Sequence, residues 1–135
     1  MAGSADIENY LMKMGVPHEE VAPCTWMIHD EYEMIDNIIV SFNEPVVFFR
    51  VKLMDIPTNC DKMKLYETLL SLNTTDMMHG AYGLEGNSIV ATDTLQSENL
   101  DFNEFQASVD SLSLCISNHY FTTLAPFHAR KSEQN

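Results

Sequence analysis

The chain has 135 residues, 45% of them hydrophobic, which is typical of one domain with a modest core. Twenty acidic residues against seven basic ones give a formal net charge of -13. Such a negative field repels phosphate backbones and anionic lipid head groups, so it argues against nucleic acid and membrane partners and favours basic or amphipathic polypeptides. Solubility alone is the alternative explanation of this acidity.

The three cysteines, Cys24, Cys60 and Cys115, are widely spaced and form no Cys-x-x-Cys pair. An odd, scattered set of this kind indicates free thiols in a reducing compartment. The sequence has no apolar run long enough to span a bilayer and no signal peptide with a basic start and an apolar core. We therefore expect a cytoplasmic protein.

The first predicted element is a short helix that starts near Ser4, a candidate N-cap, and stops near Met14. Its apolar residues follow the spacing i, i+3, i+4, i+7: Ile7, Tyr10, Leu11 and Met14. Gly15 and then Pro17 end the pattern. A helix this short is not stable alone in water, so its apolar stripe must pack against another element.

Runs of β-branched and aromatic residues next predict three strands: residues 25–29, 37–42 and 46–53. In the third strand, alternate residues from Phe49 to Leu53 share one face, and Phe48, Arg50 and Lys52 share the other. This alternation predicts an antiparallel sheet with one face buried and one exposed to water. The short links between the runs indicate a meander.

The middle of the chain, residues 53–93, predicts a helix followed by a hairpin. Thr58, Asn59 and Asp61 are candidate caps for a helix over residues 61–73. Its broad buried face is built on Leu65, Leu69 and Leu72, and two further apolar residues, Tyr66 and Leu70, flank this face. The turn of the hairpin, over residues 80–91, is Gly86-Asn87.

The last predicted helix starts with Asp101 and Glu104 at capping-box spacing and ends before Pro126. Its apolar stripe is Phe102, Phe105, Val109, Leu112, Ile116 and Tyr120. The predicted order is therefore α-β-β-β-α-β-β-α, an α+β domain over residues 1–135 with its helices packed on one face of an antiparallel sheet. Residues 1–4 and 128–135 are expected to be flexible.

No motif for catalysis, a cofactor or a metal is present. The five histidines lack metal-ligand spacing, and the clusters of residues 18–20 and 29–31, which place an imidazole beside carboxylates, are expected at solvated loop ends. Gly80, Gly83 and Gly86 do not match a phosphate-binding loop and lead into a strand, so they are expected to shape the hairpin. No serine lies in a Gly-x-Ser-x-Gly motif.

The nine methionines are the one feature of the composition that points to binding, because methionine adapts to varied apolar partners; filling gaps in a core is the alternative. Met77 and Met78 are the pair expected to be most exposed. An antiparallel sheet with a free edge binds a peptide by strand addition or by filling apolar pockets. The candidate partner-binding residues, each with core packing as the alternative, are Trp26, Ile28, Phe48, Met77, Met78 and Tyr82.

Several segments together resemble a known family. They are residues 65–73, a leucine-rich helix ending in Asn73; residues 79–87, with the glycine hairpin; residues 93–95; and the helix over residues 100–124. This sequence resembles the YbjN family and the related CesT-like (Tir chaperone) type III secretion chaperones over roughly residues 26–124. The resemblance implies a secretion-chaperone-like α+β fold in a small acidic cytosolic protein, commonly a homodimer. In secretion chaperones, the dimer holds an unfolded effector segment across apolar grooves.

Two functional hypotheses follow. The first is a non-enzymatic, chaperone-like or regulatory protein-binding module that holds a partner polypeptide on an acidic homodimer, with no cofactor. The second is a small-ligand-binding protein or enzyme with a pocket between the sheet and the last helix, lined by His29, His119 and Tyr120.

Overall fold

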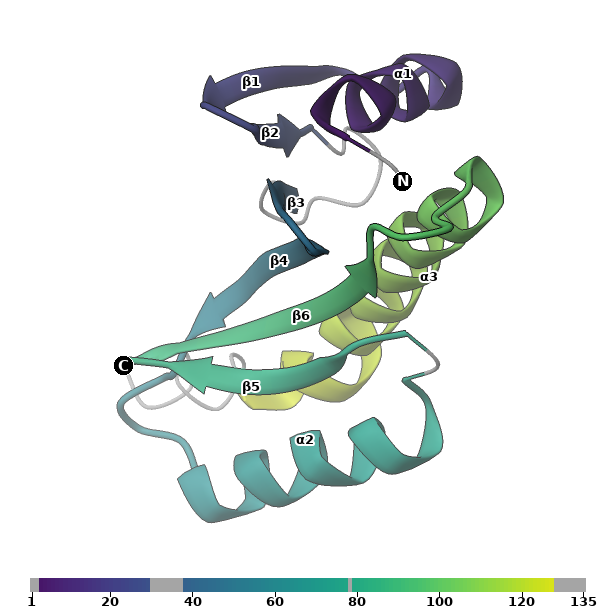
Figure 1. Cartoon of the computed structure of the whole chain (residues 1–135). Helices are drawn as coiled ribbons and strands as arrows, with labels where there is room; N and C mark the ends of the chain where they lie inside the picture. The colour runs from purple at the N-terminus through teal and green to yellow at the C-terminus, as the bar shows by residue number, and fades with distance from the viewer. Residues whose placement is uncertain (1–2, 30–37, 78, 128–135) are drawn as a thin grey trace.

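The computed structural model describes residues 3–29, 38–77 and 79–127, which form an antiparallel sheet with helices (Figure 1). The elements are, in chain order, α1 (Ser4–Met14), β1 (His18–Ala22), β2 (Thr25–Ile28), β3 (Ile38–Asn43), β4 (Val46–Asp55), α2 (Lys62–Thr75), β5 (Ala81–Glu85), β6 (Ser88–Gln96), α3 (Phe102–His119) and a π-helical turn (Tyr120–Leu124). The sheet order is β1-β2-β3-β4-β6-β5, and every pairing is antiparallel. The α+β class and the antiparallel sheet are thus confirmed.

Strand β1 is an element that the sequence prediction missed. It contains His18, Glu19 and Glu20, which were expected at a loop end, and it pairs with β2 in the register Glu19↔Met27 and Glu20↔Trp26. The strand lies at an edge of the sheet and its residues are mostly exposed, so it carries no alternation of apolar and polar side chains. Backbone pairing with β2 therefore places β1 in the sheet, and the side-chain pattern of the sequence gives no indication of the strand.

The predicted alternation in β4 is confirmed. Phe49 and Val51 face the core, whereas Phe48 and Arg50 lie on the opposite face, which is partly open to water. Across the sheet, Phe49 pairs with Val40 of β3. A register shift near the end of β4 lets two successive residues, 53 and 54, both be buried.

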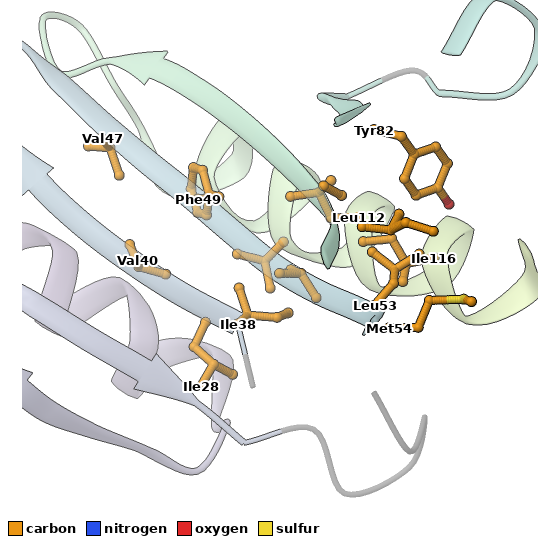
Figure 2. Packing of buried hydrophobic residues seen from close by; sticks show 14 of the residues in the cluster. Ile28, Ile38, Val40, Val47, Phe49, Leu53, Met54, Tyr82, Leu112 and Ile116 are labelled. Atoms are coloured by element: carbon orange, nitrogen blue, oxygen red, sulfur yellow. The ribbon is translucent and has the colours of Figure 1, made fainter. Parts of the chain in front are cut away.

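Helix α3 covers the apolar face of the sheet along β6 (Figure 1). Its Leu112 and Ile116 lie in the same buried cluster as Phe49, Leu53 and Met54 of β4 (Figure 2). The Phe105 ring lies 5.5 Å from that of Phe49, measured between centroids. Burying large apolar side chains of this kind stabilises the fold by about 1.5–3 kcal/mol each.

The ends of α3 show one confirmed and one wrong prediction. The Asp101 carboxylate accepts a hydrogen bond from the backbone N–H of Glu104 at 2.8 Å, as its spacing predicted. The predicted stop before Pro126 is wrong, because helical backbone continues through the π-helical turn to Phe127. The wide i→i+5 turn has already interrupted the usual i→i−4 bonds at this point, so the missing N–H of Pro126 is tolerated there.

Helix α1 packs on the start of α3. The Tyr10 ring lies 5.8 Å from that of Phe102, and the Tyr10 hydroxyl donates to the Leu100 carbonyl at 3.2 Å. The helix ends as predicted at Gly15, whose φ of 74° is left-handed. At the other end the N-cap is Gly3, and Ser4 is the first helical residue rather than the cap.

Helix α2 lies beside β5, at the opposite end of the sheet from β1 (Figure 1). The Asp61 carboxylate caps it by accepting from the backbone N–H of Lys64 at 3.1 Å. Leu65 and Leu69 are buried in the core cluster. The helix and the hairpin after it therefore close the sheet on this side, and they carry the surface described next.

Candidate protein-binding surface

A group of large apolar side chains stands exposed where α2 meets β5. Met63 is 78% exposed, Leu70 67% and Leu84 of β5 51%, and half-buried Tyr66 lies between them. We call these four residues the α2–β5 surface. Exposed apolar side chains gathered in this way mark an interaction site more often than scattered ones do.

The α2–β5 surface includes a hollow of about 280 Å³. It is lined by Tyr66, Leu69, Leu70, Asn73, Tyr82, Gly83 and Leu84. A shallower depression continues from it along α2, past Tyr66 and Leu70 to Met63. The surface is thus an open apolar groove and not an enclosed cavity, which suits a protein side chain better than a small molecule that must be buried.

The sequence of α2 explains the groove. Met63, Tyr66 and Leu70 follow the spacing i, i+3, i+7 and lie on one side of α2. Leu65 and Leu69, four residues apart, lie on another side, which faces the core. A helix with apolar residues on two sides can bury only one side against the rest of its own chain. The other apolar side stays exposed. The prediction placed Leu70 beside the buried face and did not single out Met63 or Leu84. The spacing of residues 63, 66 and 70 was the available signal.

Asn73 fixes the end of α2 to β5. Its side-chain amide donates to the Tyr82 carbonyl at 3.1 Å, and its carbonyl oxygen accepts from the Tyr82 N–H at 2.7 Å. An added strand would bind these same backbone groups of Tyr82. Asn73 already occupies them, so it takes the place of an added strand at this point of the sheet edge. The predicted helix end at Asn73 thus has a structural role, although α2 continues to Thr75.

Three side chains from three elements form a chain of hydrogen bonds behind the groove. The Tyr82 hydroxyl lies 2.6 Å from His119 Nδ1, and His119 Nε2 lies 2.9 Å from Asp76 Oδ2. Burial raises the pKa of Tyr82, and hydrogen bonds from Thr75 and then His119 lower the pKa of Asp76. Tyr82 therefore stays a hydroxyl and Asp76 a carboxylate near neutral pH.

The basic side chains of β4 are already paired. Arg50 Nε donates to Glu85 Oε2 at 3.0 Å and a second guanidinium nitrogen also contacts this carboxylate, while Lys52 Nζ lies 3.1 Å from Asp55 Oδ1. The bond with Arg50 lowers the pKa of Glu85 and raises that of Arg50. The acidic residues outnumber the basic ones over the whole sequence, so the chain keeps a net charge of -13.

The six predicted partner-binding residues are not brought together. Trp26 and Ile28 of β2 are buried in the core, and Tyr82 of β5 is buried too, although it lines the hollow. Phe48 reaches the surface on the face away from α3, and Met77 is half-buried against the core, not fully exposed. Met78 lies outside the described residues. That these six bind a partner stays a prediction.

The residues proposed for a pocket between sheet and last helix do not converge either. His29 Nε2 lies 3.5 Å from Glu19 Oε1 on β1, whereas His119 bonds with Tyr82 and Asp76. Packed side chains such as Phe49, Phe105 and Leu112 occupy the space between the sheet and α3. The geometry around His119 thus serves to join elements.

Other chemistry is not supported within the described part of the chain. No group of three or more His, Cys, Asp and Glu residues there is arranged to hold a metal ion. Nor does any helix among residues 3–29, 38–77 and 79–127 have the length and apolar character to cross a membrane. Cys24, Cys60 and Cys115 are free thiols. Gly80, Gly83 and Gly86 shape the hairpin as predicted, with Gly86 at φ 60° in its turn.

Comparison with known proteins identifies the family. The CesT_Tir_1 family model matches residues 2–129. No curated protein matches the sequence.

Three solved structures show the fold. YbjN from E. coli, described as a putative transcription regulator, is 11% identical with a TM-score of 0.65, covering 87% of this chain and 91% of its own. The HopA1–SchA chaperone–effector complex is 9% identical with a TM-score of 0.63, covering 84% and 89%. The heterodimeric ExoU–SpcU complex from the type III secretion system of Pseudomonas aeruginosa is 15% identical with a TM-score of 0.66, covering 83% and 93%.

Proposed function

Because the chain belongs to the CesT/Tir chaperone family, we propose that it is a non-enzymatic protein-binding module that holds a partner polypeptide on an acidic homodimer. Among the proteins with this fold are a chaperone–effector complex and a heterodimeric complex of a type III secretion system, which supports a polypeptide as partner. We also infer a cytoplasmic location, which the three free thiols support. The observation that carries the proposal is the exposed α2–β5 surface.

A second copy of the chain is the occupant that fits the α2–β5 surface. Met63, Leu70 and Leu84 form an exposed apolar patch, and a two-fold interface would pair this patch with itself and remove it from water. Charge favours this choice. Within its bounds α2 carries Lys62 and Lys64 against one acid, Glu67, whereas the whole chain has a net charge of -13. Two copies therefore repel each other less where their α2 helices meet than the net charge of the whole chain would imply.

The partner polypeptide fits the opposite end of the sheet. Strand β1 is an outer strand, and within the described residues no strand pairs with its outer side, so its backbone N–H and C=O groups are open to an added strand. Glu19, Glu20 and Val21 are exposed there. An extended segment that alternates basic and apolar residues complements this edge, while Asn73 protects the β5 edge.

The test captures partners with the tagged protein from its own cell lysate and then measures binding of the purified partner. The wild type is compared with a Glu19→Lys/Glu20→Lys double variant, and a Glu98→Lys/Glu104→Lys double variant reverses the same charge at exposed positions away from β1. We expect one dominant partner with a basic or amphipathic segment, bound at least about tenfold more weakly by the β1 variant, since each exposed pair contributes about 0.2–1 kcal/mol and reversal adds repulsion. The control variant should bind within about twofold of the wild type.

The contrary results are equally clear. Equal weakening by both double variants would show that net charge alone, and not the β1 edge, attracts the partner. If no protein is enriched over a tag-only control, the protein-holding function is wrong.

A further inference from the structure

The hydrogen-bond chain Asp76–His119–Tyr82 joins the parts of the molecule that form the α2–β5 surface. Asp76 is the C-cap of α2, Tyr82 lies in β5 and His119 is the last residue of α3. His119 is only 2% exposed, and the residues it links are 43 and 37 positions away in the sequence. A buried imidazole with two partners at hydrogen-bond distance is a fixed structural feature and not a solvated side chain.

The two contacts determine where the protons lie. His119 Nε2 faces a carboxylate, which only accepts, so this nitrogen carries a hydrogen and donates to Asp76. When the ring carries this single hydrogen, Nδ1 is an acceptor, and the Tyr82 hydroxyl donates to it. The raised pKa of Tyr82 and the lowered pKa of Asp76 agree with this assignment. In this arrangement each of the three side chains, Asp76, His119 and Tyr82, has a hydrogen-bond partner.

Tyr82 is held from two sides. Asn73 of α2 binds its backbone N–H and C=O, and His119 binds its hydroxyl. Both Tyr82 and Asn73 line the hollow of the α2–β5 surface. These polar contacts, together with the buried Leu65 and Leu69, set how α2 lies against β5. Hydrogen bonds constrain direction, whereas apolar contacts alone permit a helix to slide or rotate.

We propose that His119 is a positioning residue that locks the C-terminal end of α2 against β5 and thereby gives the α2–β5 surface the shape that a second copy recognises. The recognition step rests on the proposed function, but the lock itself does not. Loss of the lock leaves α2 attached through its apolar contacts and more mobile, so the surface opens locally while the rest of the sheet stays folded.

The test combines amide hydrogen exchange with measurement of self-association for three variants. His119→Leu removes both hydrogen bonds, His119→Gln keeps one donor and one acceptor, and Tyr82→Phe removes a single hydroxyl and keeps the test decisive where His119→Leu does not fold. Ser108→Ala is the control, because Ser108 is buried on α3 and its hydroxyl has no partner among the described residues.

In His119→Leu and Tyr82→Phe we expect the amides of α2 and β5 to exchange about tenfold faster, with those of α1 and β3 little changed, and self-association to weaken about tenfold. His119→Gln should resemble the wild type in both amide exchange and self-association. Ser108→Ala should change neither of them.

Uniformly faster exchange in every element would mean that His119 only stabilises the fold, and unchanged exchange in α2 would mean that the lock does not exist. A wild type that is monomeric at all concentrations refutes the recognition step and the homodimer together, while faster exchange confined to α2 and β5 still supports the lock.

Discussion

Leu70 provides the sharpest test of the α2–β5 surface. It is 67% exposed on α2, and Leu114 is 68% exposed on α3, so the two leucines are matched in type, exposure and secondary structure. Leu114 does not line the hollow. Replacing Leu70 by Asp places a carboxylate in the proposed interface, whereas the same change at Leu114 adds an equal charge elsewhere on a helix.

The magnitude follows from the exposed fraction. Fully burying a leucine side chain is worth about 2 kcal/mol, so burying the 67% of Leu70 that is exposed gives about 1.3 kcal/mol per copy. A two-fold interface contains Leu70 twice, and the loss is then about 2.7 kcal/mol, or about 100-fold in the dissociation constant. Desolvation of the two new carboxylates adds to this loss, so about 100-fold is a lower bound.

The assay is sedimentation velocity over a concentration series of the wild type, Leu70→Asp and Leu114→Asp, at one ionic strength. We expect a dimer for the wild type and for Leu114→Asp at micromolar concentrations, and a monomer for Leu70→Asp with unchanged circular dichroism. Because Leu70 is exposed in the single chain, the variant should keep the thermal stability of an isolated subunit.

Two results would refute the reasoning. If Leu70→Asp remains a dimer, the second copy does not contact the α2–β5 surface. If both variants become monomers, added negative charge on an already acidic chain, and not the apolar contact, controls association.

Two further predictions concern the single chain. An added Cβ at Gly80, which has φ +79°, would lie 2.3 Å from the Thr92 carbonyl oxygen, whereas Gly83 has nothing within 4 Å of that position. Gly80→Ala should therefore lower the free energy of unfolding in urea by about 2–4 kcal/mol and Gly83→Ala by less than about 1 kcal/mol; equal effects would contradict the packing of the hairpin. The folded-state pKa values of Asp76 and Glu85 lie below their ordinary values of 3.8 and 4.5, so the unfolded chain binds more protons at acid pH. The stability that these carboxylates give is present above those ordinary values and is lost as the pH falls through the lower folded values. Asp76→Asn and Glu85→Gln should therefore flatten the acid side of a plot of unfolding free energy against pH. An unchanged slope would contradict the pairing of these carboxylates.

The secondary structure was predicted correctly where the pattern of apolar and polar side chains along the sequence matches the helix or strand that forms. The stripe of α1, the alternation in β4 and the turn at Gly86 were readable because each depends on residues close in sequence. Strand β1 was missed because its residues are mostly exposed and show no alternation of apolar and polar side chains, while its place in the sheet follows from backbone pairing with β2. Pro126 misled because a π-helical turn before it removed the usual conflict with helix.

The candidate site was less predictable. Trp26 and Tyr82 were predicted to bind a partner on apolar patches of the sheet, with core packing as the alternative, and the structure buries both. Leu70 was placed near the buried face of its helix and is exposed. The spacing of apolar residues fixes which of them share a side of a helix or strand, but it does not say which side another element will cover.

By itself, the sequence determined the α+β class, nearly all the elements and the strongly negative net charge, because composition and short-range periodicity suffice for these. Only the tertiary structure decided which apolar residues of α2 stay exposed, and only it joined Asp76, Tyr82 and His119. Contacts between residues about forty positions apart depend on how α2, β5 and α3 pack together, and no local pattern records that packing.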